Sequence, residues 1–153
     1  TQQLVKTALL TRERTVTRKI KEAVLTIAVE IMYSKNDILE MYLNHIPYGG
    51  TSLGIEAAAK TYFGKSAKDI SLGEAALLAW LPQAPSRYSP FGINPDLAIA
   101  RQREVLRRMV EDKYITQEQA DAVEAQPLQY VENKVNIQAP HFVFYVRDLL
   151  EQK

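Results

Sequence analysis

The chain has 153 residues, of which 46% are hydrophobic and 24% charged, a balance typical of one folded domain that excludes an intrinsically disordered protein. Its formal net charge is only +1, and it contains no cysteine, which excludes disulfide bonds and thiolate metal sites. No apolar run reaches the roughly 18 residues that a membrane-spanning helix needs.

Positive charge is concentrated at the N-terminal end. Residues 1–22 hold six basic residues against two acidic ones, a local balance of +4, so the remainder carries −3 of the total of +1. The basic residues are Lys6, Arg12, Arg14, Arg18, Lys19 and Lys21. Because helical patterns run into both chain ends, we also expect these 153 residues to be part of a longer protein.

The first long helix is predicted to begin near Thr15 or Thr17, because either residue is a suitable N-cap. From residue 20 onward, apolar residues recur at offsets of four, seven, eight and eleven positions, which is one stripe of an amphipathic helix. The stripe consists of Ile20, Val24, Ile27, Ala28 and Ile31. We expect this stripe to face the hydrophobic core.

Shorter helices follow in chain order. Ser34 with Asp37 resembles a capping box and predicts a helix that continues to Leu43. Residues 47–50 are predicted to form a turn or loop because of their proline and glycines. A further helix is predicted over residues 55–62, with the glycine at position 64 capping its C-terminus.

A second capping box, Ser71 with Glu74, precedes an apolar helix that should stop at Pro82. Four prolines between positions 82 and 95 predict an extended, stiff surface loop. Asn94 and Pro95 are expected to cap and begin a long helix that ends near residue 112.

The final elements are predicted from weaker signals. Thr116 and Gln119 predict the start of another helix. Residues 127–139 favour irregular or extended structure, and Pro140 opens a last helix. The elements together predict an all-α fold, divided into a domain over residues 1–126 and its C-terminal end with a linker over residues 127–153.

The candidate chemistry lies on the first long helix. Arg14, Arg18 and Glu22 are spaced by four, so they share one face if the helix reaches back to Arg14, and this face lies opposite the predicted apolar stripe. Lys19 flanks them, and Gln3 and Lys6 lie upstream. One interpretation is a solvated helix face with an ion pair of a few tenths of a kcal/mol. The other is that these cations and amides hold a diphosphate.

Four sequence blocks resemble motifs of the family 51 peptidoglycan glycosyltransferases, in the order of that family. Thr-Gln-Gln-Leu-Val-Lys over residues 1–6 resembles the second motif, and Arg-Lys-Ile-Lys-Glu over residues 18–22 the third. Residues 38–44, followed by a glycine at 49, resemble the fourth motif, and residues 77–90 the fifth region. The tail over residues 139–143 resembles the segment that leads to the transpeptidase half of class A penicillin-binding proteins.

The resemblance implies a lysozyme-like helical domain at the outer, periplasmic face of the cytoplasmic membrane, anchored by a transmembrane helix that precedes this chain. It implies polymerisation of lipid II, with the growing glycan on a polyprenyl diphosphate as the donor and inversion at the anomeric carbon. A linked transpeptidase domain and the membrane surface are the other expected partners, and nucleic acid is not one. The catalytic base is expected to be a first-motif glutamate upstream of Thr1.

The resemblance also assigns roles to residues of this chain. Gln3 and Lys6 would hold sugar and diphosphate oxygens, Arg14 and Arg18 would face the diphosphate, and Lys19 would assist. Glu22 matches the second glutamate of the family, which orients those cations or a divalent ion such as Mg²⁺ or Mn²⁺. No cofactor is required by the sequence. Among several cations, the pKa of Glu22 should be lowered, which suits an orienting role. Asn44 is either a helix cap or a substrate contact.

Two other functions compete with the glycosyltransferase. A lysozyme-like lytic enzyme would share the helical fold and a glutamate, but it has no need for cations that hold a diphosphate. A helical module that binds anionic lipid or another anion would use the same basic end without catalysis.

Overall fold

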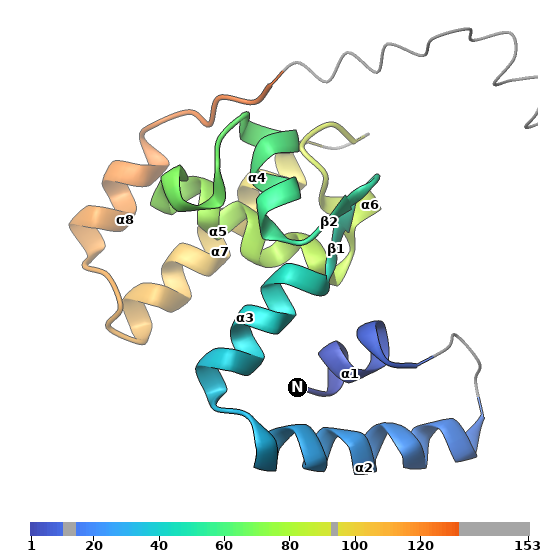
Figure 1. Cartoon of the computed structure of the whole chain (residues 1–153). Coiled ribbons are helices and arrows are strands. Elements are labelled where there is room, and N and C mark those ends of the chain that lie inside the picture. Colours follow the sequence, from blue (N-terminus) through green and yellow to red (C-terminus); the bar gives the residue numbers. More distant parts are fainter. Residues whose placement is uncertain (11–14, 93–94, 132–153) are drawn as a thin grey trace, which may run out of the picture.

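The computed structural model describes residues 1–10, 15–92 and 95–131, and the segments between and after them lie outside the description (Figure 1). The predictions for Arg14, for Asn94 as a cap, and for a linker and last helix beyond residue 131 therefore fall outside the described residues. Within that part of the chain, no helix is both long enough and apolar enough to cross a bilayer.

Three helices form one side of the molecule. The short helix α1 (Gln2–Ala8) lies along the long helix α2 (Val16–Met32), and α3 (Lys35–His45) leads away toward the other helices (Figure 1). Thr15 caps α2, because its side chain accepts a hydrogen bond from the backbone N–H of Arg18. The capping box predicted at the start of α3 is also present.

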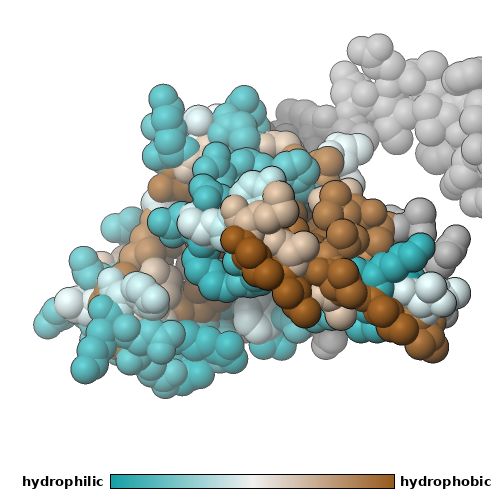
Figure 2. Space-filling model, turned by 60° about the horizontal axis from the view of Figure 1, so that its bottom comes forward, coloured by the Kyte–Doolittle hydropathy of each residue, from teal (hydrophilic) through white to brown (hydrophobic). Residues whose placement is uncertain are grey.

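The prediction for the apolar stripe of α2 is wrong. Ile20, Val24, Ile27 and Ile31 are exposed and Ala28 is half-buried, whereas Glu22 on the other face is buried. The reason is that α1 and α3 pack against the face that carries Glu22, so the buried side of α2 is chosen by its neighbours rather than by its own hydrophobicity. Figure 2 shows hydrophobic side chains exposed in a band on the side of the molecule where α2 lies.

A small β-hairpin forms where the sequence predicts a turn or loop over residues 47–50. Strands β1 (Pro47–Gly49) and β2 (Ser52–Leu53) pair antiparallel and lead into α4 (Ile55–Phe63). Gly64 ends α4 in the left-handed conformation, with a φ of 67°, as predicted. A single 3₁₀ turn, η1 (Ala67–Asp69), follows.

The proline-rich segment is helical in part, not an extended loop. After the predicted capping box, α5 (Leu72–Trp80) runs into a 3₁₀ turn, η2 (Leu81–Gln83), and then into α6 (Pro85–Tyr88). Proline supplies the helical φ at the first turn of a helix, where its missing N–H is not needed. Two of the four prolines occupy such positions, so they begin helical turns instead of preventing them.

Two further helices complete the described fold. The long helix α7 (Asp96–Glu111) packs along α5, and α8 (Gln117–Glu124) packs against both. Arg101 of α7 lies over the ring of Trp80 on α5, 4.7 Å from its centroid, and so contributes to the packing of these two helices. Residues 127–131 carry no regular element, as predicted.

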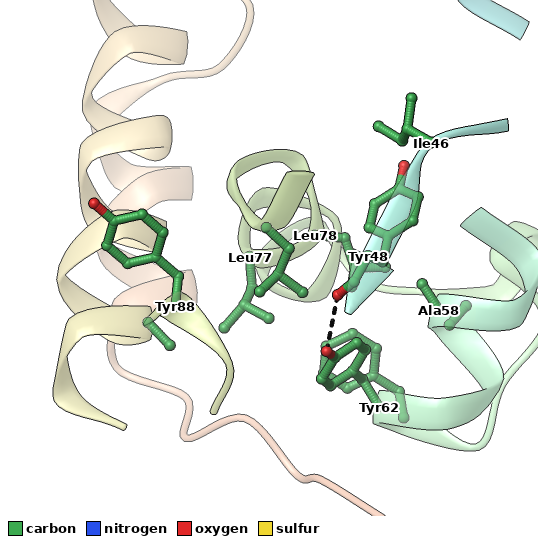
Figure 3. Packing of buried hydrophobic residues seen from close by; sticks show 11 residues of the cluster. Ile46, Tyr48, Ala58, Tyr62, Leu77, Leu78 and Tyr88 are labelled. Atoms are coloured by element: carbon green, nitrogen blue, oxygen red, sulfur yellow. Dashed lines mark hydrogen bonds between the residues drawn. The ribbon is translucent and has the colours of Figure 1, made fainter. Parts of the chain in front are cut away.

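The main core lies between the hairpin, α4 and α5. Side chains from these elements meet in Figure 3, where the hydroxyl of Tyr62 donates to the carbonyl of Tyr48 at 2.9 Å. Leu77 and Leu78 of α5 fill the centre of this cluster. The hairpin is therefore held by the core and not by its two short strands alone, which would be marginally stable.

Candidate functional site

The candidate site is built around Glu22, in the second turn of α2. Its side chain is 1% exposed. Oε1 of Glu22 lies 2.7 Å from Nζ of Lys19, and Oε2 lies 3.4 Å from Nη2 of Arg18. Helical spacings of three and four residues place these two cations over the carboxylate. The structure therefore brings together three of the predicted site residues.

Glu22 remains ionised in this environment. The hydrogen bond from Lys19 lowers the pKa of Glu22 most, and the charge of Lys19, a hydrogen bond from Gln2 and the charge of Arg18 lower it further against the opposing effect of burial. The predicted lowering is confirmed in direction. A carboxylate held in this way is suited to orienting cations and not to donating a proton.

The two cations differ in how far they reach solvent. The side chain of Arg18 is only 15% exposed, and its Nε is buried without a hydrogen-bond partner among the described residues. Lys19 is 61% exposed, so its ammonium reaches solvent while it contacts Glu22. Together with the carboxylate they leave a net positive charge, which favours an anionic ligand with several oxygen acceptors.

Helix α1 contributes the amide side chains. Leu4 and Val5 are buried and hold α1 against its neighbours, while Gln3 and Lys6 are exposed. Oε1 of Gln3 accepts a hydrogen bond from the hydroxyl of Tyr42 on α3, with a distance of 3.4 Å. Lys6 makes no hydrogen bond or ion pair within the described part of the chain, so its ammonium is free to bind a ligand.

Sequence reasoning missed Gln2 and Tyr42. Gln2 approaches Glu22 of α2, and Tyr42 approaches Gln3. Gln2 precedes Lys6 by one helical turn, so the sequence alone indicates that the two side chains share one face of α1. The contact of Tyr42 joins residues 39 positions apart, which no local pattern reveals.

Asn44 is not the helix cap that one interpretation predicts. Helix α3 continues to His45, and Ile46 is the cap residue, with its N–H bonded to the carbonyl of Tyr42. Asn44 instead lines a groove of about 280 Å³ together with neighbouring residues of α3 and the start of α4. Its role as a substrate contact stays a prediction.

The residues at this site do not fit a metal ion held by the protein. Within the described residues, no three His, Asp or Glu side chains gather closely enough to hold one. Glu22 is already paired with Lys19 and Arg18, and those charges oppose a further cation. A divalent ion bound through the oxygens of the diphosphate stays a prediction.

The pH dependence of stability should reveal the pairing of Glu22. A carboxyl group whose folded-state pKa lies below its ordinary value of 4.5 stabilises the fold above that pH, and this contribution is lost as the pH falls through the lowered pKa. Thermal unfolding of the domain in the full-length protein and in Glu22→Gln should therefore differ by a constant amount near neutral pH. The difference should shrink only below pH 4.5. A difference that shrinks between about pH 5 and 7 would contradict this assignment, because it would report a raised pKa.

The comparisons with known proteins point to one family. The Transglycosylase family model matches residues 1–110. Penicillin-binding protein 1A of Aquifex aeolicus is 52% identical over 128 residues, which cover 84% of this chain and 18% of that protein. Penicillin-binding protein 1A of Escherichia coli is 40% identical over 156 residues, covering 100% of this chain and 18% of that protein.

A solved structure supports the same relationship. The crystal structure of penicillin-binding protein 1A from Haemophilus influenzae is similar with a TM-score of 0.64 and 38% sequence identity, over 80% of this chain and 18% of that chain. The predicted all-α, lysozyme-like fold is confirmed, with the β1–β2 hairpin as its small exception. This chain spans less than a quarter of the length of these relatives. It belongs to the Transglycosylase family.

Proposed function

We propose that this chain is part of a peptidoglycan glycosyltransferase and supplies the site that holds the diphosphate of its lipid-linked substrates. The observation that carries the proposal is the buried, ionised Glu22 with Arg18 and Lys19 directed around it. A helix that needed only a surface ion pair would not bury the carboxylate to 1% exposure. The family match and the names of the relatives support the same function.

The chemistry of glycan polymerisation explains this arrangement. The 4-hydroxyl of lipid II attacks the anomeric carbon of the growing chain, the bond to the polyprenyl diphosphate breaks, and the anomeric centre inverts. Negative charge gathers on the leaving diphosphate, and fixed donors at that position lower the barrier. Arg18, Lys19 and Lys6 supply those donors, and Glu22 holds the first two in place. The resemblance assigns the base to a first-motif glutamate, which no residue of this chain matches.

We also propose that the exposed apolar face of α2 contacts the membrane that carries these substrates. Ile20, Val24, Ile27 and Ile31 form a continuous stripe on this face, and Lys21 lies beside it. An amphipathic helix with apolar residues and flanking lysines binds in the interfacial plane of an anionic bilayer. This location would bring the diphosphate of a membrane-embedded substrate close to the cations of the same helix.

Polymerisation of lipid II by the full-length gene product is the direct test. Arg18→Met should reduce the rate of glycan-strand formation at least about tenfold, because it removes one cation from the leaving group. Arg103→Met is the matched control, since Arg103 of α7 also pairs with a glutamate, at 3.3 Å, but lies outside the site. The control should polymerise at the native rate.

Other products would support the competing functions. Cleavage of purified glycan strands without lipid II polymerisation would favour the lytic enzyme. Binding of anionic vesicles with neither reaction would favour the binding module. Either result would overturn the glycosyltransferase proposal.

A further inference from the structure

Tyr42 makes a long-range contact whose chemistry the proposed function does not use. It lies in the last turns of α3, and its ring packs against the main core cluster. Its hydroxyl extends beyond that core and donates to Oε1 of Gln3 on α1, at 3.4 Å. The two parts of this side chain therefore have separate roles: the ring packs against the core, and the hydroxyl donates to a residue of the candidate site.

The direction of this hydrogen bond decides what Gln3 offers to a ligand. A glutamine amide has an acceptor oxygen on one side and two N–H donors on the other. When Oε1 is occupied by a tyrosine hydroxyl, Nε2 is left to face outward with its donors. Oxygens of a diphosphate or of a sugar are acceptors, so this orientation of the amide is the one that binds them.

We propose that Tyr42 is a positioning residue that fixes the amide of Gln3 with its N–H donors directed at an oxygen of the lipid-linked diphosphate sugar. The inference rests on the proposed function and deepens it, because it assigns a task to a further residue of the fourth motif. Gln3 touches the substrate in this proposal, whereas Tyr42 acts only through Gln3.

The surroundings of Tyr42 keep its hydroxyl protonated, so that it remains a hydrogen-bond donor. Burial raises the pKa of Tyr42 above its ordinary value, so the hydroxyl stays protonated at any pH at which the protein works. A hydrogen bond from the neighbouring Gln2 contributes to the lowered pKa of Glu22. Two consecutive glutamines of α1 are thus directed at α3 and at α2.

Tyr42→Phe in the full-length protein isolates the hydroxyl, since the ring and its core packing remain. We expect the KM for lipid II to rise about three- to tenfold with little change in kcat, which corresponds to the loss of one hydrogen bond that orients a binding group. The melting temperature should stay the same. Tyr114→Phe is the matched control, because Tyr114 is 76% exposed, and it should leave KM unchanged.

A second pair of variants separates positioning from general stability. Gln3→Ala should raise KM by a similar factor, and the double variant Tyr42→Phe with Gln3→Ala should be no worse than Gln3→Ala alone. Gln3→Glu should be worse than Gln3→Ala, because its carboxylate still accepts from Tyr42 but repels the diphosphate. Independent, multiplying effects of the two single changes would overturn the inference.

The outcomes distinguish this inference from the function on which it rests. If the native protein polymerises lipid II and Arg18→Met is impaired, but Tyr42→Phe behaves like Tyr114→Phe, only the role of Tyr42 is refuted. If the native protein does not polymerise lipid II, the proposed function fails and the role of Tyr42 fails with it.

Discussion

Replacing Glu22 with glutamine should lower the kcat for lipid II polymerisation by roughly 10²- to 10³-fold while the domain keeps its fold. Glutamine has nearly the same shape as glutamate but no charge, so Lys19 and Arg18 lose the partner that holds them at 2.7 and 3.4 Å. Both cations are then free to adopt other rotamers. The loss should fall on kcat more than on KM, because correct placement of these charges matters most when the leaving group becomes anionic.

Glu104→Gln provides the matched control. Glu104 on α7 also receives two cations, Arg107 at 3.0 Å and Arg108 at 2.8 Å, which lower its pKa to about 2. It lies on α7, which packs with α5 and α8 and is separated from α1 and α2 (Figure 1), so its loss should leave polymerisation unchanged. Glycan products and the melting temperature should be measured for both variants. Native activity in Glu22→Gln, or equal losses in the two variants, would remove Glu22 from the site.

Gly54→Ala should be the most destabilising single methyl addition at a described glycine of positive φ. Gly54 begins α4 with a φ of 82°, and a Cβ there would lie 2.5 Å from the carbonyl oxygen of Asn44. That oxygen belongs to the backbone of α3 and cannot move alone. Because conformational strain and steric overlap act together, we expect a loss of about 3 kcal/mol or more in the free energy of unfolding.

Gly50→Ala separates these two causes. Gly50 also has a positive φ, of 54°, but a Cβ there would meet no atom within 4 Å. Its substitution should cost only about 1 kcal/mol, from strain alone. Denaturant unfolding of the domain gives both values. Equal losses of unfolding free energy at the two positions would contradict the prediction, because they would show that the backbone of α3 moves away from the added methyl group at little cost.

Local chemistry made the helices and their starts predictable. Thr15, and the capping boxes at Ser34, Ser71 and Thr116, all act as their side chains suggest. These signals work at short range, because the cap and the N–H groups it satisfies are three residues apart. The proline-rich segment was mispredicted since a proline that interrupts one helix is equally suited to begin the next.

The features that the sequence pattern did not predict are determined by tertiary contacts. The spacing of Arg18 and Glu22 predicted their pairing, but the hydrophobicity of α2 predicted the wrong buried face. A helix with apolar residues on two sides does not reveal which side its neighbours will cover. The contacts of Gln2 and Tyr42 were likewise unpredictable, because they depend on how α1 is placed between α2 and α3.

The stacking of Arg101 on Trp80 gives this chain an intrinsic optical reporter. Trp80 is the single tryptophan of the 153 residues, and its ring also meets Tyr88 edge-on, with the ring centroids 6.3 Å apart. Indole emission from this chain therefore reports whether α5 and α7 are packed together. Trp80 lies outside the cluster around Glu22. If a substitution in that cluster leaves the emission spectrum unchanged, the packing of α5 against α7 is intact.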